Sequence, residues 1–291
     1  MPKNILFLRG ISDSNLSMQP RDQALSGISG AEVDTAALDD LVFDLSIESS
    51  SLQVNNTDIE KYDLVVFHGT APHYRIAYPA ALILKQKNIN FINSGITDYA
   101  GIDKLSQYAR FGGIGVPFPR TIFSNFGNLK VRAQEIFDFP FIVKGVIASQ
   151  GRKNYLVGNS EDLEQINDDT DYKTGMFVAQ QYIDNEYDLR LLFIGDELIV
   201  IRRTAAEGSH LNNISAGATG EIVSADAVKP EILKDSLAIR DEFRFEICGI
   251  DVLVDTQSGE HFFSEINSQP QLFGGAETEA KIAALERLLG R

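Results

Sequence analysis

The stretch GIDVLVDTQSGEHFFSEIN, residues 249–267, predicts a β-hairpin that presents three polar side chains together. Two apolar runs flank the turn residues TQSG, as in a pair of antiparallel strands. Asp251 interrupts the first run. Glu265 and Asn267 lie two positions apart on the second run, so both side chains leave the same face of their strand. We expect the hairpin to bring all three side chains to one point.

Two carboxylates and one amide in a mostly apolar hairpin indicate a metal site. A buried carboxylate is costly unless its charge is compensated, and a divalent cation with oxygen ligands supplies that compensation. The set leaves coordination positions open for water and phosphate oxygens, as Mg²⁺ usually requires. The alternative is a strand whose polar residues face solvent, but the run 249–255 has no wholly polar face. We therefore favour the metal site.

A lysine at the end of an apolar strand is a second functional feature. FPFIVK, residues 139–144, predicts a strand that ends at Lys144, and ASQG at 148–151 predicts a polar loop after it. The backbone N–H groups of such a loop can close over phosphates, with the lysine as the counter-charge. Without other features, this pattern is equally typical of an ordinary strand end.

A third segment could bind the adenine and the ribose of a nucleotide. VAQQYI, residues 178–183, predicts a strand whose last backbone groups can contact the edge of adenine, and Asp188 can accept a hydrogen bond from a ribose hydroxyl. Considered alone, the segment is a core strand followed by a polar turn.

The first part of the chain has the order of a small open α/β domain. Apolar runs predict strands at 5–9, 41–47, 51–54, 62–67 and 89–93, with a helix at 74–87. Residues 10–36 are rich in Ser, Gly, Asp and Gln, and we expect loop and one short helix there.

The remainder predicts two further units. The first has helices at 98–111, 129–137 and 161–166 and strands at 120–123, 140–145, 155–157 and 176–183. The second is mostly antiparallel, with a hairpin at 188–203, the hairpin at 249–267 and helices at 231–247 and 277–289. In the helix at 231–247 we expect the core-facing residues to be Leu233, Leu237, Ile239 and Phe243.

Composition excludes several classes of protein. The net charge of −15 and the pI near 4.7 repel a phosphate backbone, so we expect no nucleic-acid partner. The single cysteine, Cys248, excludes an internal disulfide and a thiolate metal cluster, and a small buried side chain is the favoured interpretation. The first apolar run is too short for a signal peptide or a membrane span, so we expect a cytoplasmic protein.

In their order, these segments resemble the ATP-grasp superfamily, and within it the branch of RimK and the prokaryotic glutathione synthetases. The resemblance runs from about residue 60 to the C-terminus. The segments that carry it are Asp103-Lys104, the strand ending at Lys144, the loop SQG at 149–151, QQYI at 180–183, Asp188-Leu189-Arg190, Arg202-Arg203, NNISAG at 212–217, Gly249-Ile250-Asp251 and Glu265-Ile266-Asn267. It implies an α/β (α+β) ATP-grasp fold in three units, namely an N-terminal domain at 1–95, a central subdomain at 96–183 and a C-terminal subdomain at 184–291.

The resemblance also implies roles for individual residues. The ATP-binding set is Lys104, Lys144, Ser149, Gln150, Gly151, Gln181, Tyr182, Ile183 and Asp188. The Mg²⁺ ligands are Asp251, Glu265 and Asn267. The catalytic set near the transferred phosphoryl is Arg203, Asn213 and Arg190.

Several positions depart from the family pattern. Gln181 replaces a usual acidic residue, and Ala148 and Lys153 replace usual glycines in the phosphate loop. Leu211 and Ala216 stand where basic residues are usual, which puts the acceptor substrate in doubt.

The resemblance implies an ATP- and Mg²⁺-dependent ligase, with Mn²⁺ as a substitute metal, that joins a carboxylate to an amine through an acyl-phosphate. The carboxylate and the amine are expected to be small molecules or peptides, and the enzyme to act on an amino acid, a peptide or a protein tail. We expect the loops at 10–36 and 204–220 to line the substrate pocket. No membrane partner is expected, and a homo-oligomer stays open. The alternatives are an ATP-grasp phosphotransferase and a degenerate nucleotide-binding protein.

Overall fold

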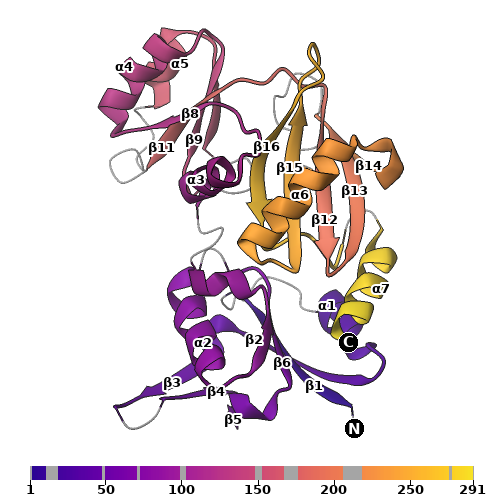
Figure 1. The fold of residues 1–291 in the computed structure, drawn as a ribbon. Coiled ribbons are helices and arrows are strands. Elements are labelled where there is room, and N and C mark those ends of the chain that lie inside the picture. The colour runs from indigo at the N-terminus through magenta and orange to yellow at the C-terminus, as the bar shows by residue number, and fades with distance from the viewer. Residues whose placement is uncertain are drawn as a thin grey trace.

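The computed structural model describes residues 2–10, 19–47, 50–70, 73–98, 103–147, 153–166, 176–205, 218–274 and 277–290. The described strands form four sheets, and helices cover their faces (Figure 1). None of the helices within these ranges has the length and apolar character needed to span a membrane.

A parallel sheet with the strand order β2-β1-β6-β7 forms the N-terminal part. Its strands are β1 (Lys3–Arg9), β2 (Ala31–Ala37), β6 (Leu64–Phe67) and β7 (Asn90–Ile92). Helix α2 (Tyr74–Gln86) packs on one face of this sheet, and α1 (Gln19–Ser26) lies beside β2. The predicted open α/β arrangement is therefore present, and α1 is a short helix within 10–36 as expected, but β2 begins in the same range, where no strand was expected.

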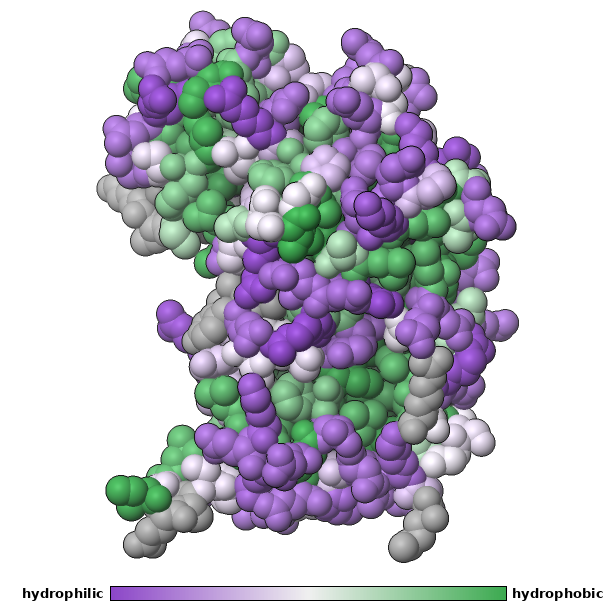
Figure 2. Space-filling model, viewed as in Figure 1, coloured by the Kyte–Doolittle hydropathy of each residue, from purple (hydrophilic) through white to green (hydrophobic). Residues whose placement is uncertain are grey.

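A small antiparallel sheet projects from the N-terminal part. It comprises β3 (Leu41–Leu45), β4 (Ser50–Val54) and β5 (Thr57–Asp58). Figure 2 shows hydrophobic residues at the tip of this projection. Val42, Leu45 and Ile47 are the exposed apolar side chains there.

A second four-stranded sheet, with the order β10-β9-β11-β8, is antiparallel. Its strands are β8 (Thr121–Phe123), β9 (Phe141–Gly145), β10 (Asn154–Val157) and β11 (Phe177–Gln181). Helices α4 (Phe126–Ile136) and α5 (Ser160–Gln165) cover one face and share a core with it. Side chains on the other face, such as Ile142 and Lys144, alternate with those that face the helices.

The C-terminal part is a five-stranded antiparallel sheet with the order β14-β13-β12-β15-β16. Its strands are β12 (Tyr187–Ile194), β13 (Glu197–Thr204), β14 (Thr219–Val223), β15 (Ile247–Val254) and β16 (His261–Asn267). Helix α6 (Pro230–Phe243) packs on one face, and α7 (Thr278–Leu289) packs on the other. Helix α3 (Lys104–Ile114) lies between this sheet and the second four-stranded sheet (Figure 1).

Four short 3-10 helices complete the described elements. They span Leu38–Asp40, Ile59–Lys61, Ser94–Asp98 and Ala225–Ala227.

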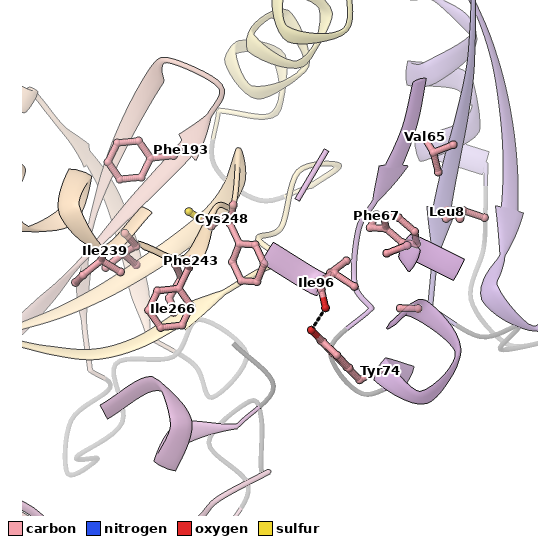
Figure 3. Packing of buried hydrophobic residues seen from close by; sticks show 14 of the residues in the cluster. Leu8, Val65, Phe67, Tyr74, Ile96, Phe193, Ile239, Phe243, Cys248 and Ile266 are labelled. Carbon is pink, nitrogen blue, oxygen red and sulfur yellow. Dashed lines mark hydrogen bonds between the residues drawn. The ribbon is translucent and has the colours of Figure 1, made fainter. Parts of the chain in front are cut away.

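A hydrophobic core links the N-terminal and C-terminal parts. It runs from Leu8 and Phe67 of the parallel sheet to Phe243 and Cys248 near α6 (Figure 3). The hydroxyl of Tyr74 donates a hydrogen bond to the carbonyl of Ile96 inside this core. Cys248 is completely buried, and burial raises the pKa of its thiol, which agrees with the predicted structural role.

Three boundary predictions are wrong. Helix α3 was expected at 98–111, but it begins at Lys104 because the Asp103 side chain caps it, and it ends at Ile114, before Gly115, which has a φ of +73°. The helix expected at 231–247 ends at Phe243, and Leu237 is 43% exposed rather than core-facing. The chain then turns through Arg244, with a φ of +50°, and β15 begins at Ile247. The unit boundaries after 95 and 183 stay a prediction.

Candidate active site

The charged residues of the candidate site lie at one end of one face of the five-stranded sheet. Cross-strand pairing places Asp188 opposite Arg203 and Arg190 opposite Asp251. Asp251 in turn lies opposite Glu265 on β16. Because directly paired residues share a sheet face, these side chains form one continuous row. The rest of this face is apolar and is covered by α7 and the parallel sheet.

Asp251 is the centre of the row. Arg190 grips its carboxylate through Nε and Nη2, each at 2.7 Å from an oxygen, and Arg203 Nη2 lies 3.1 Å from Oδ2. Burial opposes ionisation of Asp251, but the two guanidinium groups outweigh burial and hold its pKa at about 2. Asp251 is therefore an anion at any physiological pH.

Asp188 and Arg203 form a second, deeply buried pair. Arg203 Nε and Nη2 donate to the two Asp188 oxygens at 2.7 and 2.6 Å, and the arginine is only 2% exposed. Burial disfavours the charged guanidinium, but Asp251 and Asp188 outweigh it and raise the pKa of Arg203. The predicted ribose contact of Asp188 stays a prediction, because both of its oxygens are engaged in this pair.

A β-bulge at Ser264 sets the direction of Glu265. The register runs from Asp251 opposite Glu265 to Val252 opposite Phe263, so Ser264 is the extra residue. The bulge allows Phe263 and Ile266, three positions apart, to enter the same core. Glu265 and Asn267 are thereby left on the opposite side, in line with Asp251, as the spacing of the sequence predicted.

Two lysines face this row from outside the sheet. Lys104 begins α3, and its Nζ lies 3.5 Å from Glu265 Oε1. Lys144 lies on β9 of the facing sheet, and its Nζ lies 5.3 Å from the centroid of the Tyr108 ring. Burial lowers the pKa of Lys144 to about 8, although Glu265 and Asp251 act in the opposite direction.

The predicted adenine segment is the link between the two sheets. Gln181 ends β11, and its N–H donates to the Arg120 carbonyl at 2.9 Å. Tyr182 is half-buried and Ile183 is buried before β12 begins at Tyr187. These residues therefore form the connection between the two sheets, on the chain segment that leads to Asp188.

Some predicted residues cannot be placed. Ser149, Gln150 and Gly151 of the phosphate loop and Asn213 of the catalytic set lie outside the described residues, as do Ala148, Leu211 and Ala216.

The residues present fit a nucleotide with a divalent cation. Four cationic side chains, Lys104, Lys144, Arg190 and Arg203, gather around three carboxylates, Asp188, Asp251 and Glu265. This excess of positive charge suits the phosphates of a nucleotide. Beside Lys144, on the strand paired with it, the buried Oδ1 of Asn154 has no hydrogen-bond partner, as is typical of a group that meets a ligand.

One part of the sequence argument is wrong. A cation was expected to supply the charge compensation of the buried carboxylates, but Arg190 and Arg203 already supply it for Asp251. Within the described ranges, no group of three or more His, Cys, Asp and Glu side chains is arranged to hold a metal. The predicted set contains only two carboxylates, with Asn267 as its third member, and Asn267 lies opposite Gly249 on the same edge.

Sequence reasoning missed Gln107, Tyr108 and Asn154. Gln107 and Tyr108 are buried on the face of α3 that begins with Lys104 and ends with Phe111. Their spacing of three and four residues from Lys104 was the available sign that they share its face. Asn154 gave no comparable sign, because a polar residue at the start of a strand is common.

Comparison with known proteins identifies similar chains. A family model described as the RimK-like ATP-grasp domain matches residues 98–290. A probable alpha-L-glutamate ligase 1 of Shewanella baltica (strain OS155 / ATCC BAA-1091) is 23% identical over 228 residues, which cover 75% of this chain and 74% of that protein.

Solved structures are similar over nearly the whole chain. The macrocyclase MdnC bound with precursor peptide MdnA from Microcystis aeruginosa MRC has a TM-score of 0.70 at 15% identity, covering 98% of this chain and 99% of that one. D-alanyl-alanine synthetase A from Vibrio cholerae O1 biovar eltor str. N16961 has a TM-score of 0.67 at 15% identity, covering 100% and 99%. At this level of identity, the likeness establishes the fold.

Proposed function

Because the chain belongs to the RimK-like ATP-grasp family, we propose that the space between its two antiparallel sheets binds ATP and Mg²⁺ to join a carboxylate to an amine. The observation that carries this proposal is the convergence of Lys104, Lys144, Arg190 and Arg203 on the row of carboxylates. Such a cluster of cations stabilises negative charge on a triphosphate and on the phosphoryl group that leaves it.

The proposed roles follow from position. Lys144 on the second four-stranded sheet and Lys104 on α3 neutralise phosphate oxygens from two sides. Asp251, Glu265 and Asn267 would hold Mg²⁺, which supplies charge neutralisation at the phosphates when bound. The Arg190 guanidinium, a quarter exposed, faces the reacting groups, and the buried Arg203 orients Asp251 from behind. Asn213 is proposed for the same reacting centre on the strength of the family pattern.

The reaction has two steps. A substrate carboxylate oxygen attacks the γ-phosphorus of ATP, which forms an acyl-phosphate and releases ADP. The amine nitrogen of the second substrate then attacks the acyl carbon, loses a proton and displaces inorganic phosphate, which leaves an amide. The chain's cations lower the barrier of the first step by offsetting the charge that develops on the transferred group.

The substrate class is proposed from the similar proteins and from the fold. Those proteins are named for glutamate ligation, for macrocyclisation of a precursor peptide and for D-alanyl-alanine synthesis. We therefore propose an amino acid or a peptide as the carboxylate and as the amine. The substrates would enter where the carboxyl ends of β1 and β6 meet the chain after Asn267, since open α/β sheets bind ligands at such an edge.

The all-oxygen donor set suits Mn²⁺ as a replacement for Mg²⁺. The acidic charge of −15 suits small or peptide substrates over nucleic acids, and we place the enzyme in the cytoplasm.

The test is a screen for ATP consumption against mixtures of amino acids and dipeptides, followed by mass spectrometry of the products. We expect ADP, free phosphate and an amide in equal amounts, all dependent on divalent metal. Lys144→Ala should weaken nucleotide binding by about 10- to 150-fold, because it removes a charge-assisted contact. A phosphorylated substrate without an amide would replace the ligase by a phosphotransferase, and the absence of metal-dependent nucleotide binding would refute the site.

A further inference from the structure

Helix α3 is bound tightly to the free edge of the five-stranded sheet. β16 is the last strand of that sheet among the described residues, so the backbone groups on its outer side have no strand partner within this part of the chain. The Gln107 side chain fills two of these positions, accepting from Ile266 N–H at 2.9 Å and donating to the Ile266 carbonyl at 3.1 Å. The Tyr108 hydroxyl donates to the Ser264 carbonyl at 2.9 Å. Two neighbouring residues of α3 thus hold the segment that carries Glu265.

Tyr108 also contacts the opposite sheet. The face of its ring lies under Lys144 of β9, with Nζ 5.3 Å from the ring centroid. Phe118 stacks on the same ring at 5.6 Å with an interplanar angle of 12°. The ring therefore has a defined orientation, with one contact to the cation and a packed aromatic neighbour.

A buried ammonium gains from such a ring. Lys144 is 8% exposed, and no ion pair of its own is among the salt bridges between described residues. Its charge is supported at a distance by Glu265 and Asp251, and both of these carboxylates have closer cationic partners. The negative face of an aromatic ring attracts an ammonium within about 6 Å, most strongly where water is excluded.

We propose that Tyr108 is a positioning residue of the nucleotide site, whose ring holds the Lys144 ammonium charged and directed at the phosphates. This inference rests on the proposed function. It adds that the ring of Tyr108, rather than its hydroxyl, is the part that acts on the Lys144 ammonium.

The experiment is a double-mutant cycle read by calorimetric binding of Mg·ADP to the whole chain. Tyr108→Leu should weaken binding by about 2- to 30-fold, and Tyr108→Phe, which keeps the ring, should stay within about twofold of the wild type. In a Lys144→Met background, Tyr108→Leu should have almost no further effect, because its target is gone. Ile114→Ala, at the other end of α3 and packed against the same core, controls for a general loosening of the helix.

A series of fluorinated side chains at position 108 tests the inference even if the Tyr108→Leu protein does not fold. Fluorinated phenylalanines at position 108 keep the ring shape and reduce its negative face, so the dissociation constant should rise step by step with fluorine number. Equal effects of Tyr108→Leu in both backgrounds, or a flat fluorine series, would overturn the inference while leaving the proposed function intact. A wild-type chain that does not bind Mg·ADP would instead overturn both.

Discussion

Two arginines and two lysines share the site, but burial affects them differently. Arg190 and Arg203 hold bidentate ion pairs, and a guanidinium stays protonated in proteins. Lys144 can lose its proton near neutral pH, because burial lowers its pKa to about 8. The site therefore contains one cation whose charge depends on pH near neutrality.

We expect nucleotide affinity to fall as pH rises above 8. The ADP phosphates are already fully ionised there, while Lys144 loses its proton, so Mg·ADP binding should weaken by about tenfold or more between pH 7 and pH 9.5. The linkage to folding has the opposite sign. The unfolded lysine, with a pKa near 10.5, binds a proton that the folded one has lost, so this group adds stability as pH rises from about 8 to 10.5. Calorimetry and denaturant titrations against Lys144→Met, which should lack both trends, provide the check.

At the scale of elements, long apolar runs with clear ends were predictable. The hairpin at 249–267 and the strand that ends near Lys144 were both found, because each buries a continuous row of side chains. Strands β2 and β14 were missed because they lie at sheet edges and contain many polar or exposed residues. Their pairing depends on the neighbouring strand rather than on their own pattern.

In the site, too, features set by local sequence spacing were predictable and features set by tertiary packing were not. Glu265 and Asn267 could be paired from their spacing, and Asp251 from the hairpin between them. The bulge at Ser264 and the contacts of Gln107 and Tyr108 with β16 could not, because they depend on where α3 docks. The bidentate ion pair of Arg190 with Asp251 could not be predicted either, because it depends on the register between β12 and β15.

The bulged strand provides a test of the metal ligands. We expect Glu265→Gln to lower kcat by about 10²-fold or more, because weakened Mg²⁺ binding no longer offsets charge on the transferred phosphoryl. Stability should fall slightly, since Lys104 loses the charge of its neighbour. Glu260→Gln, exposed just before the same strand, is the control and should change neither property. Equal turnover of ATP by the two variants would show that Glu265 is not a metal ligand.

At the scale of the whole molecule, the short segment that follows β16 contacts the N-terminal sheet. A ring nitrogen of His68, after β6, lies 3.1 Å from the Pro270 carbonyl. Lys281 of α7 holds the other end of this segment, donating to the carbonyls of Gln271 and Gly274 at 3.0 and 2.9 Å. The segment after Asn267 is therefore fixed between two parts of the molecule, at the edge where we place the substrates.

Gly69 lies at the centre of this junction. Its φ is +77°, and a Cβ there would lie 2.6 Å from the Gln269 side-chain amide. Gly30 has a similar φ of +80°, but a Cβ there would meet nothing within 4 Å. The two glycines thus share the same backbone requirement, but Gly69 is buried against Gln269 whereas Gly30 is exposed.

We expect Gly69→Ala and Gly30→Ala to lose similar stability, about 1–2 kcal/mol each, because both force an L-residue into the left-handed region. The flexible Gln269 side chain can move aside, so its displacement adds little to that cost. The displaced Gln269 side chain should, however, raise the KM for the amino acid or peptide substrate several-fold in the Gly69→Ala variant and not in Gly30→Ala. The KM for ATP should stay unchanged in both variants. Gln269→Ala should reproduce that change in KM. Adding Gly69→Ala to it should have no further effect on KM, because both substitutions take the Gln269 side chain away from its position at the junction. If Gly30→Ala shifts the substrate KM as much, or Gly69→Ala changes only stability, the substrates bind elsewhere than at this junction.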